Sequence, residues 1–174
     1  MAEVNWHAFR TKFNNKEQHA FEQLAYQLFC SEYKRSEGIF RFKNQTGIET
    51  EPIKVNRTWV GFQAKFFEGS LSTGKNQMIS SIRKAKKKNP NLKKILFYVN
   101  AEFGESTNRR KKDSAYKTEI EKVAKKLGVT LVWRVPSHIE RQLFKPVNQF
   151  SGFKIAQCPA RVFLLLSSLD SLSL

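Results

Sequence analysis

The sequence has few of the residues that build disulfide frameworks and metal clusters. It holds two cysteines, Cys30 and Cys158, and three histidines, none of them spaced as ligands of one metal ion. This excludes a disulfide scaffold and a CxxC zinc site. Aspartate occurs only at Asp113 and Asp170. A hard-cation site in the first hundred residues therefore has to take its carboxylates from glutamate.

Long apolar runs and acidic residues are also scarce. No apolar stretch reaches the roughly 18 residues that a membrane-spanning helix needs. The first residues, MAEVNWHAFRTKF, lack the apolar core of a secretory signal. We therefore expect a cytoplasmic protein with no membrane partner. Against 31 Lys and Arg stand only 15 Asp and Glu, which gives a net charge of +16. Such an excess attracts polyanions, and nucleic acid is the first partner to consider.

The 174 residues, 40% of them hydrophobic, suffice for about one domain with a buried core. Apolar spacing and turn residues predict strands and helices in alternation. The first predicted helix begins at Lys16, and Gly38 marks the end of its region. The other predicted helices span residues 75–88, 114–127 and 138–144, and the predicted strands span 39–43, 48–55, 58–67, 93–99 and 129–135. This order indicates an α/β fold with a mixed central sheet flanked by helices, because β-α-β units demand parallel pairing.

The two ends of the chain differ from this pattern. Residues 1–15 are expected to form an N-terminal arm or a short first helix. Residues 146–174 are poor in basic residues and end in VFLLLSSLDSLSL. They are expected to be a C-terminal tail or the stub of a following segment. Trp59 and Trp133 fall within predicted strands, so we expect both in the core.

Basic residues concentrate between Arg83 and Lys112, where eleven Lys and Arg stand against two Glu. The excess is too one-sided for mutual pairing and favours a surface that contacts phosphates. The alternative is an ordinary solvated helix face. The residues predicted to bind nucleic acid are Lys84, Lys88, Arg109, Arg110 and Lys111.

The segment from Gly47 to Phe67, GIETEPIKVNRTWVGFQAKFF, carries the residues suited to chemistry. Gln63 and Lys65 are two apart on a predicted strand, so they share one face. If the preceding extended segment pairs with this strand, Glu49 converges on them, and Glu51 is an alternative ligand. Carboxylate and amide oxygens suit Mg²⁺. A nearby lysine can stabilise charge that develops at phosphorus.

Three short motifs on this element order resemble the PD-(D/E)xK restriction-endonuclease-like superfamily over roughly residues 16–144. The closer likeness is to the Mrr-like nuclease domains at the N-termini of bacterial antiphage-defence NTPases. The motifs are Phe21-Glu22-Gln23-Leu24, Gly47-Ile48-Glu49 and Gln63-Ala64-Lys65. The resemblance implies a restriction-endonuclease-like α-β-β-β-α-β core and a nuclease domain over residues 16–145.

The resemblance also implies roles for individual residues. Glu22 would lie beside a metal site, Glu49 would bind Mg²⁺ or Mn²⁺, and Lys65 would serve catalysis. Gln63 and the main-chain carbonyl of Ala64 would complete the ligands. The implied function is that of a DNA endonuclease in bacterial defence. The implied partners are DNA, a second copy of the chain, and a fused or associated NTPase or sensor module.

Two positions depart from the superfamily pattern. Glu49 stands where aspartate is usual, and Gln63 stands where glutamate is usual. The second change removes one negative charge from the site. The sequence therefore leaves two functions open: a metal-dependent nuclease, or a nucleic-acid-binding module on the same fold that does not cut. A basic domain that binds RNA is a third interpretation, and the core-facing positions of most aromatic residues speak against it.

Overall fold

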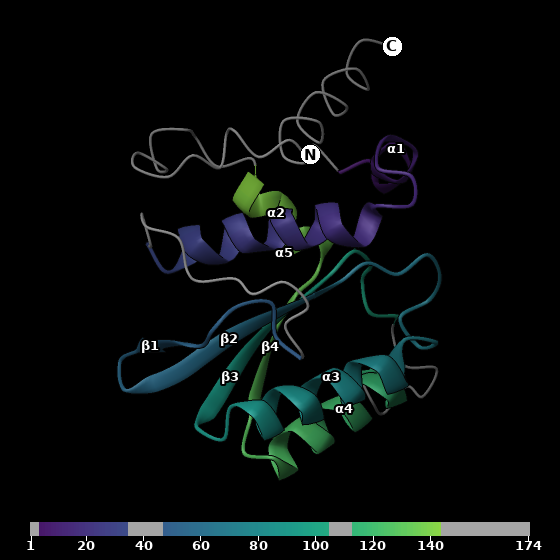
Figure 1. Ribbon diagram of the computed structural model, residues 1–174. Helices are drawn as coiled ribbons and strands as arrows, with labels where there is room; N and C mark the ends of the chain where they lie inside the picture. The colour runs from purple at the N-terminus through teal and green to yellow at the C-terminus, as the bar shows by residue number, and fades with distance from the viewer. Residues whose placement is uncertain (1–3, 35–46, 105–112, 144–174) are drawn as a thin grey trace.

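The computed structural model describes residues 4–34, 47–104 and 113–143, which form three layers (Figure 1). Helices α1, α2 and α5 cover one face of a four-stranded sheet, and α3 and α4 cover the other (Figure 1). The helices are α1 (Trp6–Lys12), α2 (Glu17–Glu32), α3 (Lys75–Lys88), α4 (Ala115–Lys126) and α5 (Pro136–Leu143). The strands are β1 (Ile53–Val55), β2 (Thr58–Lys65), β3 (Leu92–Val99) and β4 (Thr130–Arg134).

The sheet is mixed, with strand order β1-β2-β3-β4. β1 pairs antiparallel with β2, whereas β2, β3 and β4 are parallel to one another. Both crossover helices, α3 and α4, lie on the same face, as crossovers of one hand require when strands are added in sequence. The prediction of an α/β fold with a mixed sheet between helices is therefore confirmed.

Two of the strand predictions have different outcomes. The strand predicted at residues 39–43 lies outside the described residues. The strand predicted at 48–55 is too long, because only Ile53–Val55 pairs with β2. Residues 47–50 bend instead, since Gly47 packs against the backbone of α3 and has a positive φ of 86°. These bends place the segment that carries Glu49.

The two faces of the sheet have different cores. The face under α1, α2 and α5 is rich in aromatic rings, among them Phe9, Phe21, Phe29 and Phe62. The face under α3 and α4 is mainly aliphatic. Residues 1–15, predicted as an N-terminal arm or a short first helix, contain the helix α1, whose Phe9 is fully buried in the aromatic core. The predicted segment 146–174 lies outside the described residues.

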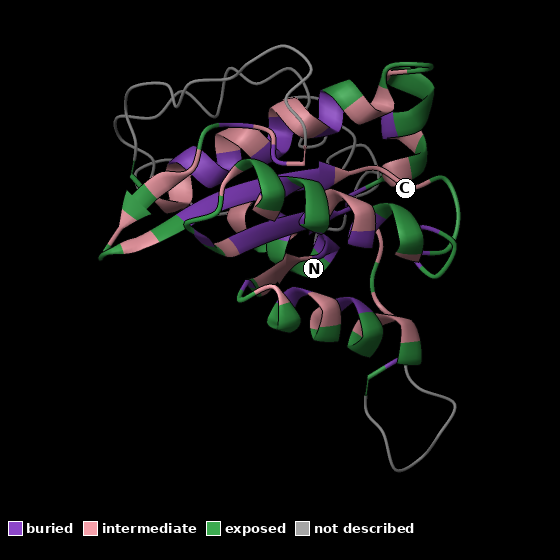
Figure 2. Cartoon of the chain, turned by 60° about the horizontal axis from the view of Figure 1, so that its bottom comes forward, coloured by how far each residue is buried: buried purple, intermediate pink, exposed green. Residues whose placement is uncertain are grey.

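The helix predictions agree with the structure to within a few residues. Gly128 has a positive φ of 67° just beyond α4, as expected for a glycine that ends a helix. Exposed residues line the outer sides of the helices, and buried residues fill the central strands (Figure 2). In the described part of the chain, no helix combines the length and apolar character needed to span a membrane.

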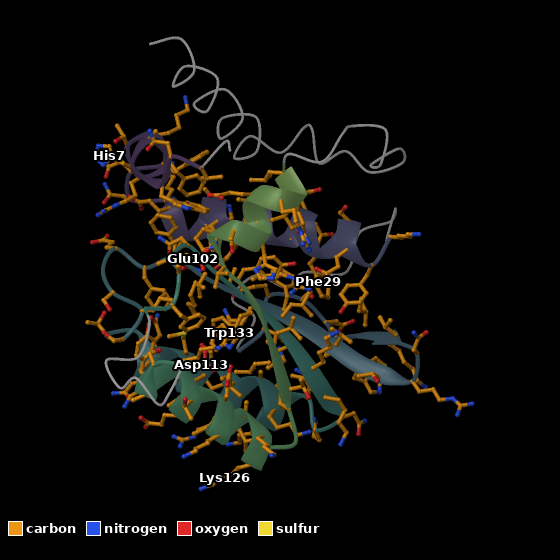
Figure 3. All side chains as sticks on the ribbon, turned by 180° about the vertical axis from the view of Figure 1, so that it is seen from behind. His7, Phe29, Glu102, Asp113, Lys126 and Trp133 are labelled. Atoms are coloured by element: carbon orange, nitrogen blue, oxygen red, sulfur yellow. The ribbon has the colours of Figure 1, made fainter. Side chains whose placement is uncertain are left out.

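The two strand tryptophans differ in their surroundings. Trp133 is partly buried against the aliphatic core, and its Nε1 donates to Glu121 of α4 at 2.8 Å (Figure 3). Trp59 is 36% exposed, so its predicted place in the core is wrong. Trp59 is the second residue of β2. Helix α3 ends at Lys88 and does not extend over the ring.

Candidate active site

Polar side chains gather along one edge of β2 near its carboxyl end. β1 pairs with β2 only as far as Val60, so the later edge carbonyls of β2 lack a strand partner. The carbonyl of Phe62 accepts from the backbone N–H of Glu49 at 3.0 Å. The carbonyl of Ala64 accepts from side-chain amides. A buried carbonyl needs a hydrogen-bond donor. Because β1 is too short to supply donors here, side-chain amides and the Glu49 N–H supply them instead.

Gln63 joins Glu49 to the Ala64 carbonyl. Its Nε2 donates to Oε1 of Glu49 and, at 3.3 Å, to the oxygen of Ala64. Gln63 is only 3% exposed, although it is polar and lies beyond the last residue of β2 that pairs with β1. The structure thus brings together Glu49, Gln63 and Ala64, the three residues predicted from the sequence as metal ligands.

Gln18 of α2 connects the same carbonyl to Glu22. Its Nε2 lies 2.9 Å from the Ala64 oxygen and 2.6 Å from Oε1 of Glu22, and its Oε1 accepts from the Phe66 N–H at 2.9 Å. Glu22 lies one helical turn after Gln18. The predicted neighbour of the metal site, Glu22, therefore belongs to one hydrogen-bonded chain with Glu49. We call this chain, Glu22–Gln18–Ala64–Gln63–Glu49, the amide relay.

The position of Glu49 depends on Gly47. A Cβ at Gly47 would lie 2.3 Å from the backbone nitrogen of Ala85, so only glycine permits this approach to α3. Ile48 and Thr50, on either side of Glu49, are fully buried. The segment is clamped between α3 and β2, which holds the Glu49 carboxylate against Gln63.

Lys65 follows Gln63 on the same side of β2, as strand alternation requires. It is half-buried and pairs in register with Val99 of β3. Just beyond it, Asn100 bonds to both the N–H and the carbonyl of Phe67, at 2.7 and 2.9 Å. These two bonds fix the chain where it leaves the strand, so the backbone that carries Lys65 is held on both sides.

Glu51, the alternative ligand, does not join the amide relay. It is exposed and lines a pocket at the amino end of β2, beside Trp59 and Lys88. Only Thr50 lies between Glu49 and Glu51 in the sequence, yet the bends at 47–50 place the two side chains near different ends of β2. Geometry favours Glu49 over Glu51 at the site.

The oxygens of the relay are of the kind that a hard divalent cation prefers. The carboxylate of Glu49 and the carbonyl of Ala64 converge on the Gln63 amide group. A rotation of that amide presents its oxygen in place of its nitrogen. The donor set therefore fits Mg²⁺ or Mn²⁺ through oxygen alone. Among residues 4–34, 47–104 and 113–143, no cluster of three or more His, Cys, Asp or Glu side chains is placed to hold a metal.

The basic residues predicted to bind nucleic acid are only partly described. Lys84 and Lys88 are exposed and four residues apart on α3, so they share one side of the helix. Arg109, Arg110 and Lys111 lie outside the described residues. Lys86, by contrast, turns inward and donates to the carbonyls of Pro90 and Leu92 at 2.6 and 2.8 Å. The outward-facing lysines are thus the ones left for a ligand.

Sequence reasoning missed Gln18 and Asn100. Gln18 belongs to no motif, and its contact with Ala64 depends on how α2 crosses the edge of the sheet. Asn100 has a weak signal, because it is a polar residue placed directly after a nearly continuous apolar strand.

Comparison with known proteins adds no assignment to this geometry. No protein-family model matches the chain, and no curated protein matches it significantly.

Proposed function

We propose that this chain is a phosphodiesterase that hydrolyses DNA with the help of Mg²⁺ or Mn²⁺. The observation that carries the proposal is the amide relay beside Lys65, which gathers two carboxylates and a main-chain carbonyl at one strand end. Phosphodiester hydrolysis needs oxygen ligands for a cation and a positive group near phosphorus.

Each residue has a defined task in this proposal. Glu49, the Ala64 carbonyl and the Gln63 amide oxygen would hold the cation. When bound, the ion supplies Lewis-acid stabilisation of charge on the phosphate and a more acidic bound water. Lys65 donates hydrogen bonds to a phosphate oxygen and stabilises the negative charge that grows there. Gln18 and Glu22 are positioning residues, since they hold the Ala64 carbonyl in place.

A restriction-endonuclease-like topology is part of the proposal. It is supported by a helix, a hairpin that ends in Gln63-Ala64-Lys65, a crossover helix and a parallel strand, in that order. The role of a bacterial defence effector rests on the motif resemblance. So do a second copy of the chain and an NTPase or sensor module as partners.

DNA as the substrate is supported by charge. The net charge of +16 and the exposed Lys84 and Lys88 favour a polyphosphate. Both lysines lie on α3, whose Ala85 touches the Gly47 turn that positions Glu49. A strand bound along α3 would therefore pass close to the amide relay.

The test is cleavage of supercoiled plasmid with Mg²⁺ or Mn²⁺, with an EDTA control. Lys65→Ala and Glu49→Gln are the site variants. Lys126→Ala is the matched control, because Lys126 is an exposed lysine at the far end of α4 (Figure 3). Metal-dependent nicking that both site variants lose and the control keeps supports the proposal. Cleavage that persists in folded Lys65→Ala protein contradicts it.

A non-catalytic nucleic-acid-binding module is the second candidate, and one contact favours it. The Gln63 amide nitrogen already satisfies the Glu49 carboxylate and the Ala64 carbonyl without a cation. This candidate predicts salt-sensitive retardation of DNA with no cleavage under any metal condition. It also predicts that Glu49→Gln leaves DNA affinity nearly unchanged.

A further inference from the structure

The amino end of β2 holds a pocket that the proposed chemistry does not use. It has a volume of about 310 Å³. Its lining residues are Glu51, Pro52, Trp59, Lys88, Asn89, Pro90, Asn91 and Leu92. Ligand pockets start at roughly 300 Å³, so this one suits a group the size of a single ring system. We call it the Trp59 pocket.

Trp59 gives the pocket an uncovered aromatic surface. It is the one large hydrophobic residue classed as exposed in the described part of the chain. It lies opposite Lys54 across the β1–β2 hairpin, and the Lys54 ammonium is 5.9 Å from its ring centroid. The backbone register between β2 and β3 shifts between Trp59 and Val60, so Trp59 lies where the regular pairing of the two strands begins. An exposed indole held in this way is a platform on which another flat ring can stack.

The charge around Trp59 is mainly positive. Lys54 and Arg57 lie on the hairpin and Lys88 on the last turn of α3, and all three are exposed. The pocket has one acidic lining residue, Glu51, and two amide side chains, Asn89 and Asn91. Lysines for a phosphate, an aromatic face for a base and amides for its edge form the set of groups that binds a nucleotide.

The pocket and the amide relay lie at opposite ends of one strand. Trp59 and Lys65 are six residues apart on β2, which is about 20 Å at the rise of a strand. Helix α3 runs back along this distance from Lys75 to Lys88. Lys84 lies beside the Gly47 turn and Lys88 lines the pocket. One phosphate backbone can therefore follow α3 and reach both ends.

We infer that the Trp59 pocket binds an unpaired DNA base, which stacks on the indole while Lys88 and Lys54 contact the adjoining phosphates. The inference rests on the proposed function only in taking DNA as the ligand, and it requires no cleavage. It assigns the protein a preference for DNA with unpaired nucleotides over intact duplex, because a base held inside a duplex cannot reach the indole.

The experiment measures binding in EDTA, so that no cleavage occurs. Fluorescence anisotropy compares the wild type, Trp59→Ala, Trp59→Phe and the Lys126→Gln control on labelled single-stranded DNA and on blunt duplex. Circular dichroism verifies that each variant folds. Stacking energies of a base on an aromatic side chain imply that Trp59→Ala weakens single-strand binding by about tenfold or more. Trp59→Phe should restore most of this loss, and Lys126→Gln should change little.

An abasic oligonucleotide tests the contact itself. If a base stacks on Trp59, replacing successive nucleotides by abasic ones lowers the affinity of the wild type at one position at least. The same oligonucleotides should make little further difference to Trp59→Ala. Equal single-strand affinities of wild type and Trp59→Ala overturn the inference, as does tighter binding of RNA than of DNA with the same sequence.

The result is separable from that of the proposed function. If Lys65→Ala abolishes plasmid cleavage while Trp59→Ala and the wild type bind DNA equally well, the inference is wrong and the nuclease proposal stands. If the wild type does not cleave plasmid but prefers single-stranded DNA in a Trp59-dependent way, the nuclease proposal is wrong and the inference stands.

Discussion

The two ends of strand β2 differ in which kind of side chain is buried and which is exposed. At the carboxyl end, Gln63 is buried and its amide bonds to Glu49 and Ala64. At the amino end, Trp59 is exposed and apolar surface faces solvent. Burial of a polar group and exposure of an apolar one both cost free energy unless something compensates. Gln63 offsets the cost of its burial with these hydrogen bonds, whereas the Trp59 ring stays partly open to solvent. Our two proposals therefore assign the carboxyl end to chemistry and the amino end to binding.

The first prediction separates the two ends by what they control. Lys65→Ala should lower the rate of plasmid cleavage by about 100-fold or more, the usual scale for a catalytic group. Its single-strand affinity in EDTA should stay within about threefold, because the group acts mainly in the transition state. Trp59→Ala should affect affinity more than rate. Single-turnover cleavage and anisotropy measure the two quantities, and a Lys65→Ala protein that loses binding as much as rate contradicts this division.

The second prediction concerns the turn that positions Glu49. Gly47→Ala places a methyl group 2.3 Å from the backbone nitrogen of Ala85 at a φ of 86°. It should lower the free energy of unfolding by about 3 kcal/mol, the combined cost of left-handed backbone strain and overpacking. Urea unfolding followed by circular dichroism measures this.

Gly69→Ala is the matched control for Gly47→Ala, since a Cβ there meets nothing within 4 Å. It should stay within about 0.5 kcal/mol of the wild type. Equal stabilities of the two variants would show that residues 47–50 are not clamped, and the geometry of Glu49 would then lose its support.

The third prediction tests Gln18 as a positioning residue. Gln18→Ala removes the donor to the Ala64 carbonyl and the acceptor for the Phe66 N–H. Cleavage should fall by about tenfold, near the cost of one or two lost hydrogen bonds. The Mn²⁺ concentration for half-maximal cleavage should rise, because the Ala64 carbonyl is less well held. A merely structural role would lower stability and leave this metal dependence unchanged.

Gln23→Ala is the control for Gln18→Ala, because it removes the same residue type from the same helix. Within the part of the chain that the structure describes, the Gln23 amide contacts His19 alone, at 3.5 Å on an exposed surface. Its substitution should leave both the cleavage rate and the metal dependence near wild type. If both substitutions lowered cleavage equally, the loss of activity would come from a disturbed helix α2 and not from the Gln18 hydrogen bonds.

The fold and the carboxyl end of β2 could largely be predicted from the sequence. Alternation along 58–65 gives the common face of Gln63 and Lys65, and the helix and strand order gives the mixed sheet. What sequence reasoning missed depends on where elements stop. Ala64 needs Gln18 because β1 ends before reaching it, and Trp59 is exposed because α3 ends at Lys88. Local periodicity carries no information on these lengths in three dimensions, so both residues looked ordinary.

The last prediction concerns a buried polar group at the carboxyl end that the amide relay leaves out. Tyr98 lies opposite Ala64 on β3 and is fully buried, and within the described residues its hydroxyl has no hydrogen-bond partner. Because an unpaired buried hydroxyl is costly, Tyr98→Phe should raise the free energy of unfolding by up to about 1 kcal/mol. The edge-to-face contact of this ring with Phe62 does not involve the hydroxyl and should remain.

The pH dependence gives Tyr98→Phe a second readout. Burial, with a smaller contribution from the Glu32 carboxylate, raises the pKa of Tyr98 well above its usual value near 10. In the unfolded chain Tyr98 ionises near pH 10, whereas in the folded protein it stays neutral, so ionisation stabilises only the unfolded state. The wild type should therefore lose stability above pH 10 more steeply than Tyr98→Phe. Urea unfolding at pH 8 and pH 10.5 measures the difference. Parallel losses in the two proteins would mean that the Tyr98 hydroxyl reaches water in the folded protein, which contradicts its burial at the carboxyl end.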